Sequence, residues 1–292
     1  MNNKKIFLLI FIPSFLSLFS CTSKPDTSQP DFHVIPNSFS WEYNSNGIYT
    51  SDVYLPEIPL IYHLVKIDLS SDYFEICAYN ANTNNHKGLS ISDFSKNSLV
   101  AFNTIPFTAS SLYHIFPNSR FVKFKTLGIH KENDMLFSNP LPRYSVLLFF
   151  KNDDDSFYVS ISENQFSSEI NNAAYAIGGY FTILKDYVPM EFPARNMDSR
   201  TACGISDDGK TLFILCVEGE NKKNSLGLSY QSCAEIFLSL GCKDAMQFDG
   251  GGSSCLFVNG QNKLSYSPSK KSTALLAFKF KNPKTPVFDS IP

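Results

Sequence analysis

The chain has 292 residues, of which 43% are hydrophobic and 14% are aromatic. This much apolar material is enough to bury a large core, so the composition excludes a disordered protein or a coiled coil for most of the length. Only 18% of the residues are charged and the formal net charge is −2. The chain therefore has no basic excess for binding nucleic acid and no acidic tail.

The N-terminus has the layout of a secretory signal. Lys4 and Lys5 precede an apolar stretch of about 14 residues, which is short for a bilayer span and ends at Cys21. The sequence before this cysteine resembles the lipobox of bacterial lipoproteins, in which the cysteine is lipidated and becomes the first mature residue. We expect a signal peptide over 1–20, a lipidated Cys21 and a polar, proline-containing tether over 21–40. The alternative is ordinary signal cleavage near Ser20. Either route leads to an extracytoplasmic location, and the lipid anchor predicts a membrane contact in the bacterial cell envelope.

The first half of the remaining chain is predicted to be mainly strand. Apolar runs, many of them alternating, predict strands over 59–69, 73–79, 98–107, 120–129 and 144–150. A short helix is expected within 90–97, and the strand over 98–107 is expected to break at Asn103. Asp153, Asp154 and Asp155 are interpreted as a solvated hairpin turn, with a surface cation site as the alternative.

The second half carries clearer boundaries. Strands are predicted over 173–181, 200–205, 211–219, 244–249, 255–258 and 273–280. Asp208-Gly209 and Asn259-Gly260 are hairpin turns. Residues 229–241 switch to a helical period, with Ser229 at the N-terminal cap and Gly241 at the C-terminal end.

These elements predict an α+β fold over 41–285, with no internal repeat and no linker that divides it. The expected architecture is a single β-rich domain with a mixed, mostly antiparallel sheet and a few packed helices. Six cysteines follow Cys21, mostly inside apolar runs, and none forms a Cys-x-x-Cys pair. We interpret them as buried thiols in preference to disulfides. Zinc is not expected, because no cysteine and histidine cluster has ligand spacing.

Residues 248–255 read FDGGGSSC and place three glycines behind an aspartate at a strand end. Consecutive backbone N–H groups without side chains form concave arrays that bind anions. Asp249 beside such an array suits a general acid, base or nucleophile that addresses another part of the substrate. The lysine of a phosphate-binding P-loop is missing, and the dinucleotide-binding glycine pattern is absent. The alternative is a tight turn or bulge without a ligand.

The surroundings of this run resemble the phosphodiester glycosidase family. The resemblance rests on the order of an Arg-Thr-Ala-x-Gly strand at 200–204, a hairpin, a helix ending at Leu240-Gly241, and DGGGSS at 249–254. It covers residues 60–280 and is strongest after 195, with thinner matches at the strand break near Asn103 and at the Gly178-Gly179 turn. The resemblance implies the fold, a hydrolase that acts on a sugar-phosphate or glycan, and no metal or other cofactor.

The resemblance also implies the site residues. Asp249 and Glu218 are the candidate pair of carboxylates that glycosidic cleavage generally needs, and Arg200 is the candidate grip on a phosphate oxygen. The candidate substrate-binding residues are Asn103, Gly179, Gly250, Gly251, Gly252, Ser253 and Ser254. Structural alternatives stay open: an Asx turn for Asp249, an exposed hairpin residue for Glu218, a surface ion pair for Arg200 and a strand cap for Asn103.

The chain departs from the family pattern close to the inferred pocket. Asp198-Ser199 stands where the family has His-Pro, Glu220 where an arginine is expected, and Thr104 where a glycine follows the asparagine. These changes remove positive charge that would pair with a phosphate. Arg195 is a candidate replacement. His86, His114 and His130 are interpreted as loop residues.

Two functions follow from this pattern. The first is an extracytoplasmic hydrolase that cleaves sugar-1-phosphodiesters, such as N-acetylglucosamine-1-phosphodiesters, in glycans or glycolipids. The alternative is a catalytically inactive glycan-binding or envelope-assembly lipoprotein on the same scaffold, which the missing positive charge favours.

Overall fold

A computed structural model describes residues 33–71, 73–115, 121–193, 196–268 and 271–281. The predicted signal peptide, Cys21 and Arg195 lie outside these ranges, as does most of the predicted tether. None of the helices within the described ranges is long and apolar enough to cross a membrane.

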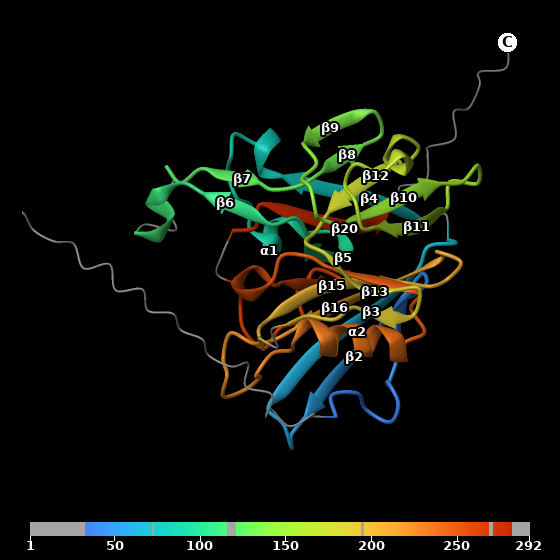
Figure 1. Cartoon of the computed structure of the whole chain (residues 1–292), viewed down its shortest axis with the longest axis vertical. Helices are drawn as coiled ribbons and strands as arrows, with labels where there is room; N and C mark the ends of the chain where they lie inside the picture. Colours follow the sequence, from blue (N-terminus) through green and yellow to red (C-terminus); the bar gives the residue numbers. More distant parts are fainter. Residues whose placement is uncertain (1–32, 72, 116–120, 194–195, 269–270, 282–292) are drawn as a thin grey trace, which may run out of the picture. The chain divides into compact units, whose positions relative to one another are not determined.

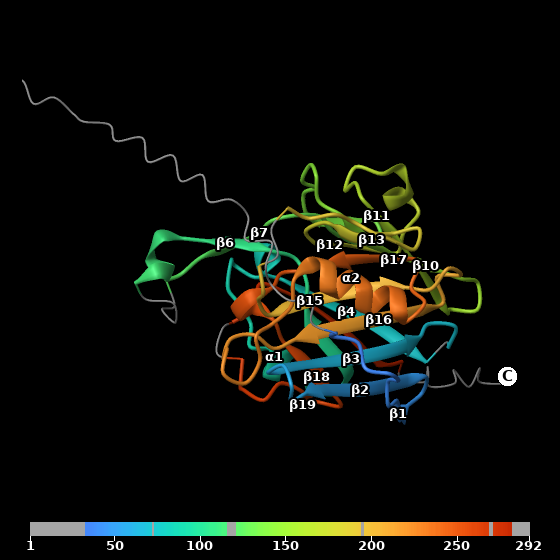
Figure 2. The same cartoon turned by 60° about the horizontal axis from the view of Figure 1, so that its bottom comes forward.

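Strands of three sheets and one separate hairpin make up most of the described chain. The largest sheet has eight strands, in the spatial order β1 (Glu42–Ser45), β2 (Ile48–Leu55), β3 (Leu60–Asp68), β16 (Thr211–Val217), β15 (Arg200–Ile205), β17 (Asp244–Gln247), β13 (Thr182–Lys185) and β14 (Val188–Pro189). A five-stranded sheet has the order β19 (Gln261–Asn262), β18 (Leu256–Val258), β5 (Ser98–Asn103), β20 (Ala274–Phe280) and β4 (Phe74–Asn80). The other five-stranded sheet has the order β11 (Phe157–Ser162), β10 (Val146–Lys151), β12 (Tyr175–Gly178), β8 (His130–Glu132) and β9 (Met135–Ser138). β6 (Phe107–Ala109) pairs with β7 (Phe124–Thr126), and in Figure 2 this hairpin extends to one side of the sheets.

Helices are few and short. The α-helices are α1 (Ile91–Phe94) and α2 (Tyr230–Ser239), and the 3₁₀ turns are η1 (Ala81–Thr83), η2 (Ser111–His114), η3 (Ser168–Asn171) and η4 (Gly251–Ser253). The predicted ends of α2 are confirmed, because the Ser229 hydroxyl accepts a hydrogen bond from the Ser232 amide at 3.1 Å and Gly241 has φ +77°.

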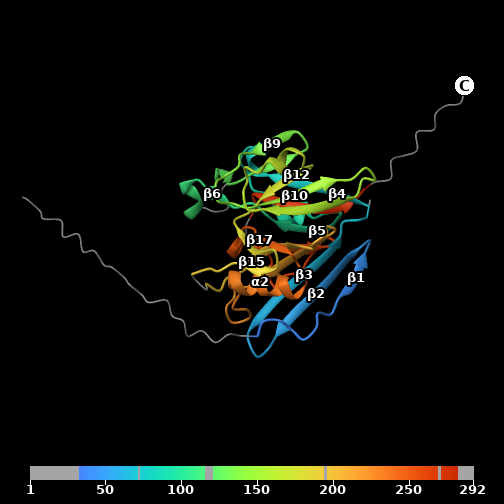
Figure 3. The same ribbon diagram turned by 45° about the vertical axis from the view of Figure 1, so that its right-hand side comes forward.

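The main hydrophobic core lies between the eight-stranded sheet and both five-stranded sheets. Ile214 contributes from the large sheet, while Phe149 and Phe278 come from the two smaller sheets and pack with their ring centroids 6.1 Å apart. α2 covers the opposite face of the large sheet, where Phe237 packs against Leu215 and its neighbours (Figures 1 and 3). The large sheet is therefore buried on both faces, which accounts for the continuous apolar runs of β15 and β16.

The β-rich α+β prediction holds in its main features, with two differences. All strand pairs in the described residues are antiparallel, and they form several sheets in place of one mixed sheet. Packing also begins before residue 41, because Val34 is buried in the core beneath α2 and its carbonyl accepts a hydrogen bond from the Tyr62 hydroxyl at 2.9 Å. Residues 34–39 therefore belong to the folded domain although the sequence places them in the tether.

The interpretation as buried thiols is confirmed for five of the six cysteines. Six free thiols are found in the described chain, at Cys77, Cys203, Cys216, Cys233, Cys242 and Cys255. All of them except Cys77 are buried, and burial raises the pKa of Cys233 and of Cys255 to about 12. They behave as small apolar residues of the core.

The loop prediction holds for two of the three histidines. His86 does lie in a loop, where its Nδ1 is 2.9 Å from the Phe124 carbonyl oxygen, and His114 ends η2. The loop interpretation is wrong for His130, which is a buried residue of β8 with its Nδ1 3.0 Å from Asn80 Nδ2. Its backbone pairs with β12, and the sequence does not reveal that long-range pairing.

The predicted aspartate turn joins β10 and β11. Asp155 takes a left-handed φ of +68° and forms ion pairs with Lys151 and Lys281. Within the described residues, no group of three or more histidine, cysteine, aspartate or glutamate side chains has the arrangement of a metal site.

Candidate active site at the ends of four strands

Four strand ends meet around the glycine run. Arg200 at the start of β15 pairs with Val217 at the end of β16, and Ala202 pairs with Gln247 at the end of β17. The fourth strand, β5, belongs to a different sheet and ends at Asn103 as predicted. The site is therefore built from both sheets that face each other across the core.

Asn103 joins the two sheets through its side chain. Its Nδ2 donates to the Asp249 carbonyl at 2.7 Å, and its Oδ1 accepts from the Thr201 hydroxyl at 2.8 Å and from the Cys255 amide at 3.0 Å. The residue is only 2% exposed. Asn103 thus positions the backbone on both sides of the glycine run. The sequence assigns its side-chain amide to the substrate, but both ends of that amide are bonded to protein groups.

The glycine run folds back on the chain as the 3₁₀ turn η4. The Gly251 amide donates to the Ser199 carbonyl at 2.9 Å, and the Ser253 and Ser254 amides donate to the carbonyls of Gly250 and Gly251 at 3.2 and 3.0 Å. Several of the N–H groups that the sequence assigns to an anion therefore already have acceptors in the protein.

Close packing explains two of the glycines, and backbone conformation explains a third. A Cβ on Gly250 would lie 2.9 Å from the Ser199 carbonyl oxygen, whereas Gly251 has the left-handed φ of +56°. Gly179 is buried, and a Cβ there would lie 2.5 Å from the Gln247 carbonyl oxygen. Gly179 therefore allows the link between β12 and β13 to lie directly on β17.

This close approach brings Tyr180 to Asp249. The Tyr180 amide donates to the Gln247 carbonyl at 2.8 Å, and its phenol is hydrogen-bonded to the Asp249 carboxylate. Burial first, and then the negative charge of Asp249, raise the pKa of Tyr180 well above its usual range. The phenol therefore stays protonated at physiological pH and donates to the carboxylate. The Tyr144 ring packs edge-on against Tyr180, with the ring centroids 5.5 Å apart.

Asp249 is half-buried and borders a small hollow. Its amide donates to the Thr104 carbonyl at 2.7 Å, which fixes the backbone at the end of β17. The hollow holds about 10 Å³ and is also lined by Phe107, Ser253 and Lys271. This volume is close to that of a single water site. Lys271 is an exposed residue at the edge of this hollow.

Arg200 lies apart from this hollow and is 6% exposed. Its Nε donates to the Leu228 carbonyl at 2.9 Å and its Nη2 to the Asn196 carbonyl at 2.7 Å. The guanidinium carbon is 4.0 Å from the centre of the Tyr230 ring, a cation–π contact. Arg200 thus ties the start of β15 to α2 and to the segment before β15. These contacts use much of the binding capacity of the Arg200 guanidinium, which the sequence assigns to a phosphate.

Glu218 belongs to a buried ionic network and is 2% exposed. Its Oε1 lies 3.0 Å from His63 Nε2 and accepts from the Ser265 amide at 2.6 Å, while its Oε2 accepts from the Ser265 hydroxyl. His63 Nδ1 is 2.8 Å from Asp52 Oδ1, and the Lys263 ammonium is 2.6 Å from Asp52 Oδ2. Glu218 does not line the hollow beside Asp249. The two predicted catalytic carboxylates therefore do not share that hollow.

Hydrogen bonds set the pKa values in this network. Burial alone would lower the pKa of His63, but its bonds to Asp52 and Glu218 outweigh burial and raise it. Burial would raise the pKa of both carboxyls, yet the bonds to His63 and their other partners lower the pKa of Glu218 and bring that of Asp52 to about 2. These shifts all favour the charged forms, so the network is an ion-paired cluster.

Two acids occupy the positions where the sequence departs from the family. Asp198 Oδ1 accepts from the Ser199 amide at 2.8 Å, and its Oδ2 lies 3.6 Å from the position of a Cβ on Gly251. Glu220 is exposed and accepts from the Ser199 hydroxyl at 3.4 Å. The departures thus add negative charge beside the glycine run.

Three residues of this region were not predicted. Tyr180 follows the Gly178-Gly179 turn directly, and that turn is the sequence feature that points to it. Lys271 lies in a polar segment before β20 and carries no comparable pattern. His63 lies within an apolar strand. A single polar residue there predicts a buried hydrogen-bond partner, because buried polar groups are hydrogen-bonded.

Comparisons with known proteins agree with this architecture. The solved fold of the zebrafish N-acetylglucosamine-1-phosphodiester alpha-N-acetylglucosaminidase catalytic domain, auto-inhibited by its pro-peptide, is similar with a TM-score of 0.59 and 15% identity, over 83% of this chain and 87% of that chain. A hypothetical protein from Synechocystis is similar with a TM-score of 0.56 and 13% identity, over 80% of this chain and 62% of that chain. A Burkholderia pseudomallei protein described as exported is similar with a TM-score of 0.57 and 12% identity, over 75% of this chain and 74% of that chain.

The sequence comparison gives the family itself. No curated protein sequence matches the chain. The family model for phosphodiester glycosidases matches residues 111–278, which is more than half of the chain and includes most of the strand ends described above. This protein therefore belongs to the phosphodiester glycosidase family.

Proposed function

We propose that this protein is an extracytoplasmic hydrolase that cleaves sugar-1-phosphodiesters, with Asp249 as its catalytic carboxylate. The observation that carries the proposal is the half-buried Asp249 carboxylate, held between two sheets at the end of β17 and hydrogen-bonded to the Tyr180 phenol. Membership of the family and the similar fold of the zebrafish catalytic domain support the substrate class.

The proposed chemistry starts from the ionised carboxylate. In this proposal Asp249 acts in its ionised form, as a base or a nucleophile, and accepts from the Tyr180 phenol. The phenol also helps to orient the carboxylate. Asp249 acts either on water or on the sugar carbon, and Tyr180 keeps it in position during the step.

The positive charge in this proposal comes from Lys271. Its ammonium at the rim of the Asp249 hollow is suited to a phosphate oxygen, as a point charge. Glu218 and Arg200 act as positioning residues, because their polar atoms are bonded to protein groups.

The test is an activity screen over sugar-1-phosphodiesters, beginning with N-acetylglucosamine-1-phosphodiesters, in water enriched in ¹⁸O. We expect sugar release by the wild type and its loss in Asp249→Asn. The label also identifies the bond that breaks, because it enters the sugar if C1–O is cleaved and the phosphate if P–O is cleaved. Equal turnover by wild type and Asp249→Asn would remove Asp249 from the mechanism.

A second candidate function is an inactive glycan-binding or envelope-assembly protein on the same scaffold. The first support for it is that Glu218 and Arg200 are hydrogen-bonded to other protein groups. The second is the negative charge that Asp198 and Glu220 bring to the region of the glycine run. This function predicts glycan binding that survives Asp249→Asn, with no sugar release by either protein.

We also propose that the protein is anchored in the bacterial cell envelope through a lipidated Cys21. The support is the signal-like sequence before this cysteine and the polar segment after it. Metabolic labelling with a fatty acid tests the anchor. We expect label in the wild type and none in Cys21→Ser, and labelling of both proteins would contradict it.

A further inference from the structure

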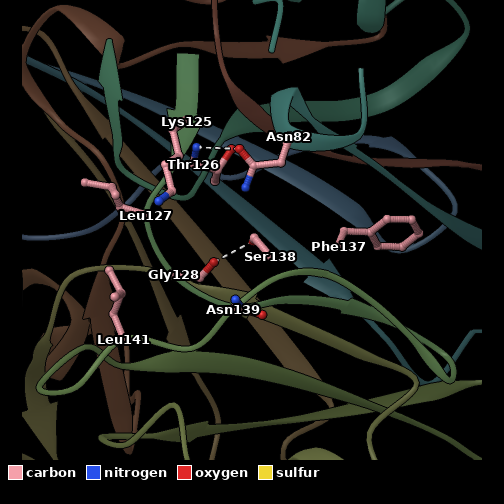
Figure 4. A pocket seen from close by; sticks show the side chains of 9 residues that line it. All are labelled: Asn82, Lys125, Thr126, Leu127, Gly128, Phe137, Ser138, Asn139 and Leu141. Atoms are coloured by element: carbon pink, nitrogen blue, oxygen red, sulfur yellow. Dashed lines mark hydrogen bonds between the residues drawn. The ribbon is translucent and has the colours of Figure 1, made fainter. Parts of the chain in front are cut away.

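Figure 4 shows the residues that line a cavity of about 300 Å³. Contacts of its wall place this cavity close to the Asp249 hollow. Ile105 lines the hollow, and its Cγ2 is 3.3 Å from the position of a Cβ on Gly128, which lines the cavity. The Leu127 amide, also from the cavity wall, donates to the Pro106 carbonyl at 2.7 Å. Residues 105–106 therefore lie between the hollow and residues of the cavity wall. The volume falls at the lower end of the range for small-molecule sites.

A buried polar network holds the walls of this cavity in place. Asn80 is 1% exposed, and its Oδ1 accepts from the Thr126 hydroxyl at 2.8 Å while its Nδ2 donates to the Ser138 hydroxyl at 3.2 Å. The Ser138 hydroxyl in turn donates to the Gly128 carbonyl at 2.6 Å. Because three segments of the chain are joined in this way, the cavity is preorganised and a ligand orders little on binding.

The groups left for a ligand combine amides, a cation and apolar surface. The Asn82 Oδ1 accepts from the Thr126 amide at 3.0 Å, and this bond turns its Nδ2 toward the cavity (Figure 4). Asn139 and Lys125 line the cavity with exposed side chains, and Phe137 adds an aromatic ring to the wall.

This combination suits a saccharide that carries an anionic group. Sugar hydroxyls accept from and donate to amide side chains, and the C–H face of a sugar ring packs on apolar side chains such as Phe137. Lys125 is the charged residue among those that line the cavity, and it pairs with a phosphate or a carboxylate.

We propose that this cavity is a subsite for an anionic saccharide unit, next to the unit that is cleaved at Asp249. The proposal rests on the proposed function for the identity of the neighbouring site. It implies a substrate longer than one sugar phosphodiester, in which either a phosphate or a uronic acid carboxylate supplies the second negative charge.

The binding experiment uses the Asp249→Asn protein, so that no probe is consumed. Dissociation constants are measured by NMR titration with methyl glucoside, glucose 6-phosphate and methyl glucuronide. We expect at least one anionic probe to bind about fivefold more tightly than the neutral one at low salt. The anionic probe that shows the preference distinguishes a phosphate from a carboxylate source.

Variants then place the binding in this cavity. Lys125→Ala is expected to remove the preference for the anionic probe. Asn139→Ala is expected to raise the dissociation constants of all three probes about threefold or more. Lys123→Ala is the matched control, because Lys123 is an exposed lysine on the same segment that does not line the cavity. Absence of binding by all three probes, or the same affinities in Lys125→Ala and Asn139→Ala as in the parent, would overturn the subsite.

The two proposals fail separately. Binding that depends on Lys125 and Asn139, without sugar release by the wild type, would contradict the hydrolase and retain the subsite. Sugar release by the wild type, with probe affinities that neither substitution changes, would retain the hydrolase and contradict the subsite.

Discussion

Asp249 depends on residues from two other segments for its position. Its amide is held by Thr104, its carbonyl by Asn103 and its carboxylate by Tyr180. Two of these contacts fix the backbone of Asp249, and the third holds its carboxylate. Preorganisation of this kind is what electrostatic catalysis requires.

Removing the phenol of Tyr180 tests this positioning. Tyr180→Phe is expected to lower kcat about 10²-fold with a small change in KM, because one preorganised donor is lost and the substrate surface is kept. Tyr144→Phe is the control, as it removes a neighbouring phenol from the same aromatic pair. Equal kcat for the two variants would contradict a role for Tyr180.

The Asn103 side chain is expected to matter for stability as much as for activity. Asn103→Ala leaves the buried Thr201 hydroxyl and Cys255 amide without their acceptor. We expect the free energy of unfolding to fall by about 2–4 kcal/mol in urea denaturation. The exposed Asn139→Ala should change it by less than about 0.5 kcal/mol. A similar small change for both would show that the two sheets do not need this link.

At the level of elements, local patterns predicted the strands well and their partners poorly. The break of β5 at Asn103, the hairpin at Asp208-Gly209 and both ends of α2 are local features, and all are found. The assignment of Glu218 as an open carboxylate failed to foresee its burial, because a glutamate at a hairpin end is usually exposed. His63, 155 residues away, and the segment at Ser265 cover it, and no local pattern shows this.

The network of Asp52, His63 and Glu218 joins β2 and β3 to the end of β16, and it makes stability depend on pH. The folded pKa of His63 is raised, so its contribution is complete below its ordinary value of 6.5 and is lost as the pH rises through the raised value. The carboxyl pKa values are lowered, so their contribution is complete above the ordinary 4.5 of Glu218 and is lost as the pH falls, toward about 2 for Asp52. The network therefore stabilises most between pH 4.5 and 6.5.

Thermal unfolding across pH checks this contribution. The wild-type Tm is expected to decline from pH 6 to 9, whereas His63→Gln should have a lower Tm throughout and a flatter decline, since the titrating group is gone. Breaking the buried pair should cost about 3–5 kcal/mol near pH 6. His86→Gln is the control, because His86 lies in a loop and contacts a backbone carbonyl. Parallel Tm profiles for wild type and His63→Gln would contradict the account of the network.

In the whole molecule, the antiparallel sheets place the ends of β5, β15, β16 and β17 together, although β5 is far from the other three strands in sequence. The family resemblance located this region, because the DGGGSS run and the Arg-Thr strand lie beside each other in the fold. The resemblance did not determine which polar side chains border a hollow and which are bonded within the protein, since that depends on packing between segments. Asp249 lines a hollow, while Arg200 and Glu218 are bonded within the protein.

The charge balance of the molecule's site separates the two candidate functions. Asp198, Glu220 and Asp249 bring negative charge to the glycine run, and Lys271 brings positive charge to the rim of the hollow. If Lys271 meets the phosphate, Lys271→Ala is expected to raise KM about tenfold and to leave the fold intact, as judged by an unchanged Tm. Lys123→Ala is the surface control. An unaltered KM in Lys271→Ala would assign the phosphate to another group.

The most direct measurement of the central claim is the rate of N-acetylglucosamine release from an N-acetylglucosamine-1-phosphodiester by the wild type, Asp249→Asn and the turn variant Asp153→Asn. We expect release by the wild type and by Asp153→Asn at equal rates. The expected rate for Asp249→Asn is about 10³-fold lower, with an unchanged Tm. Release at the same rate by all three proteins, or by none of them across the panel of sugar-1-phosphodiesters, would contradict that claim.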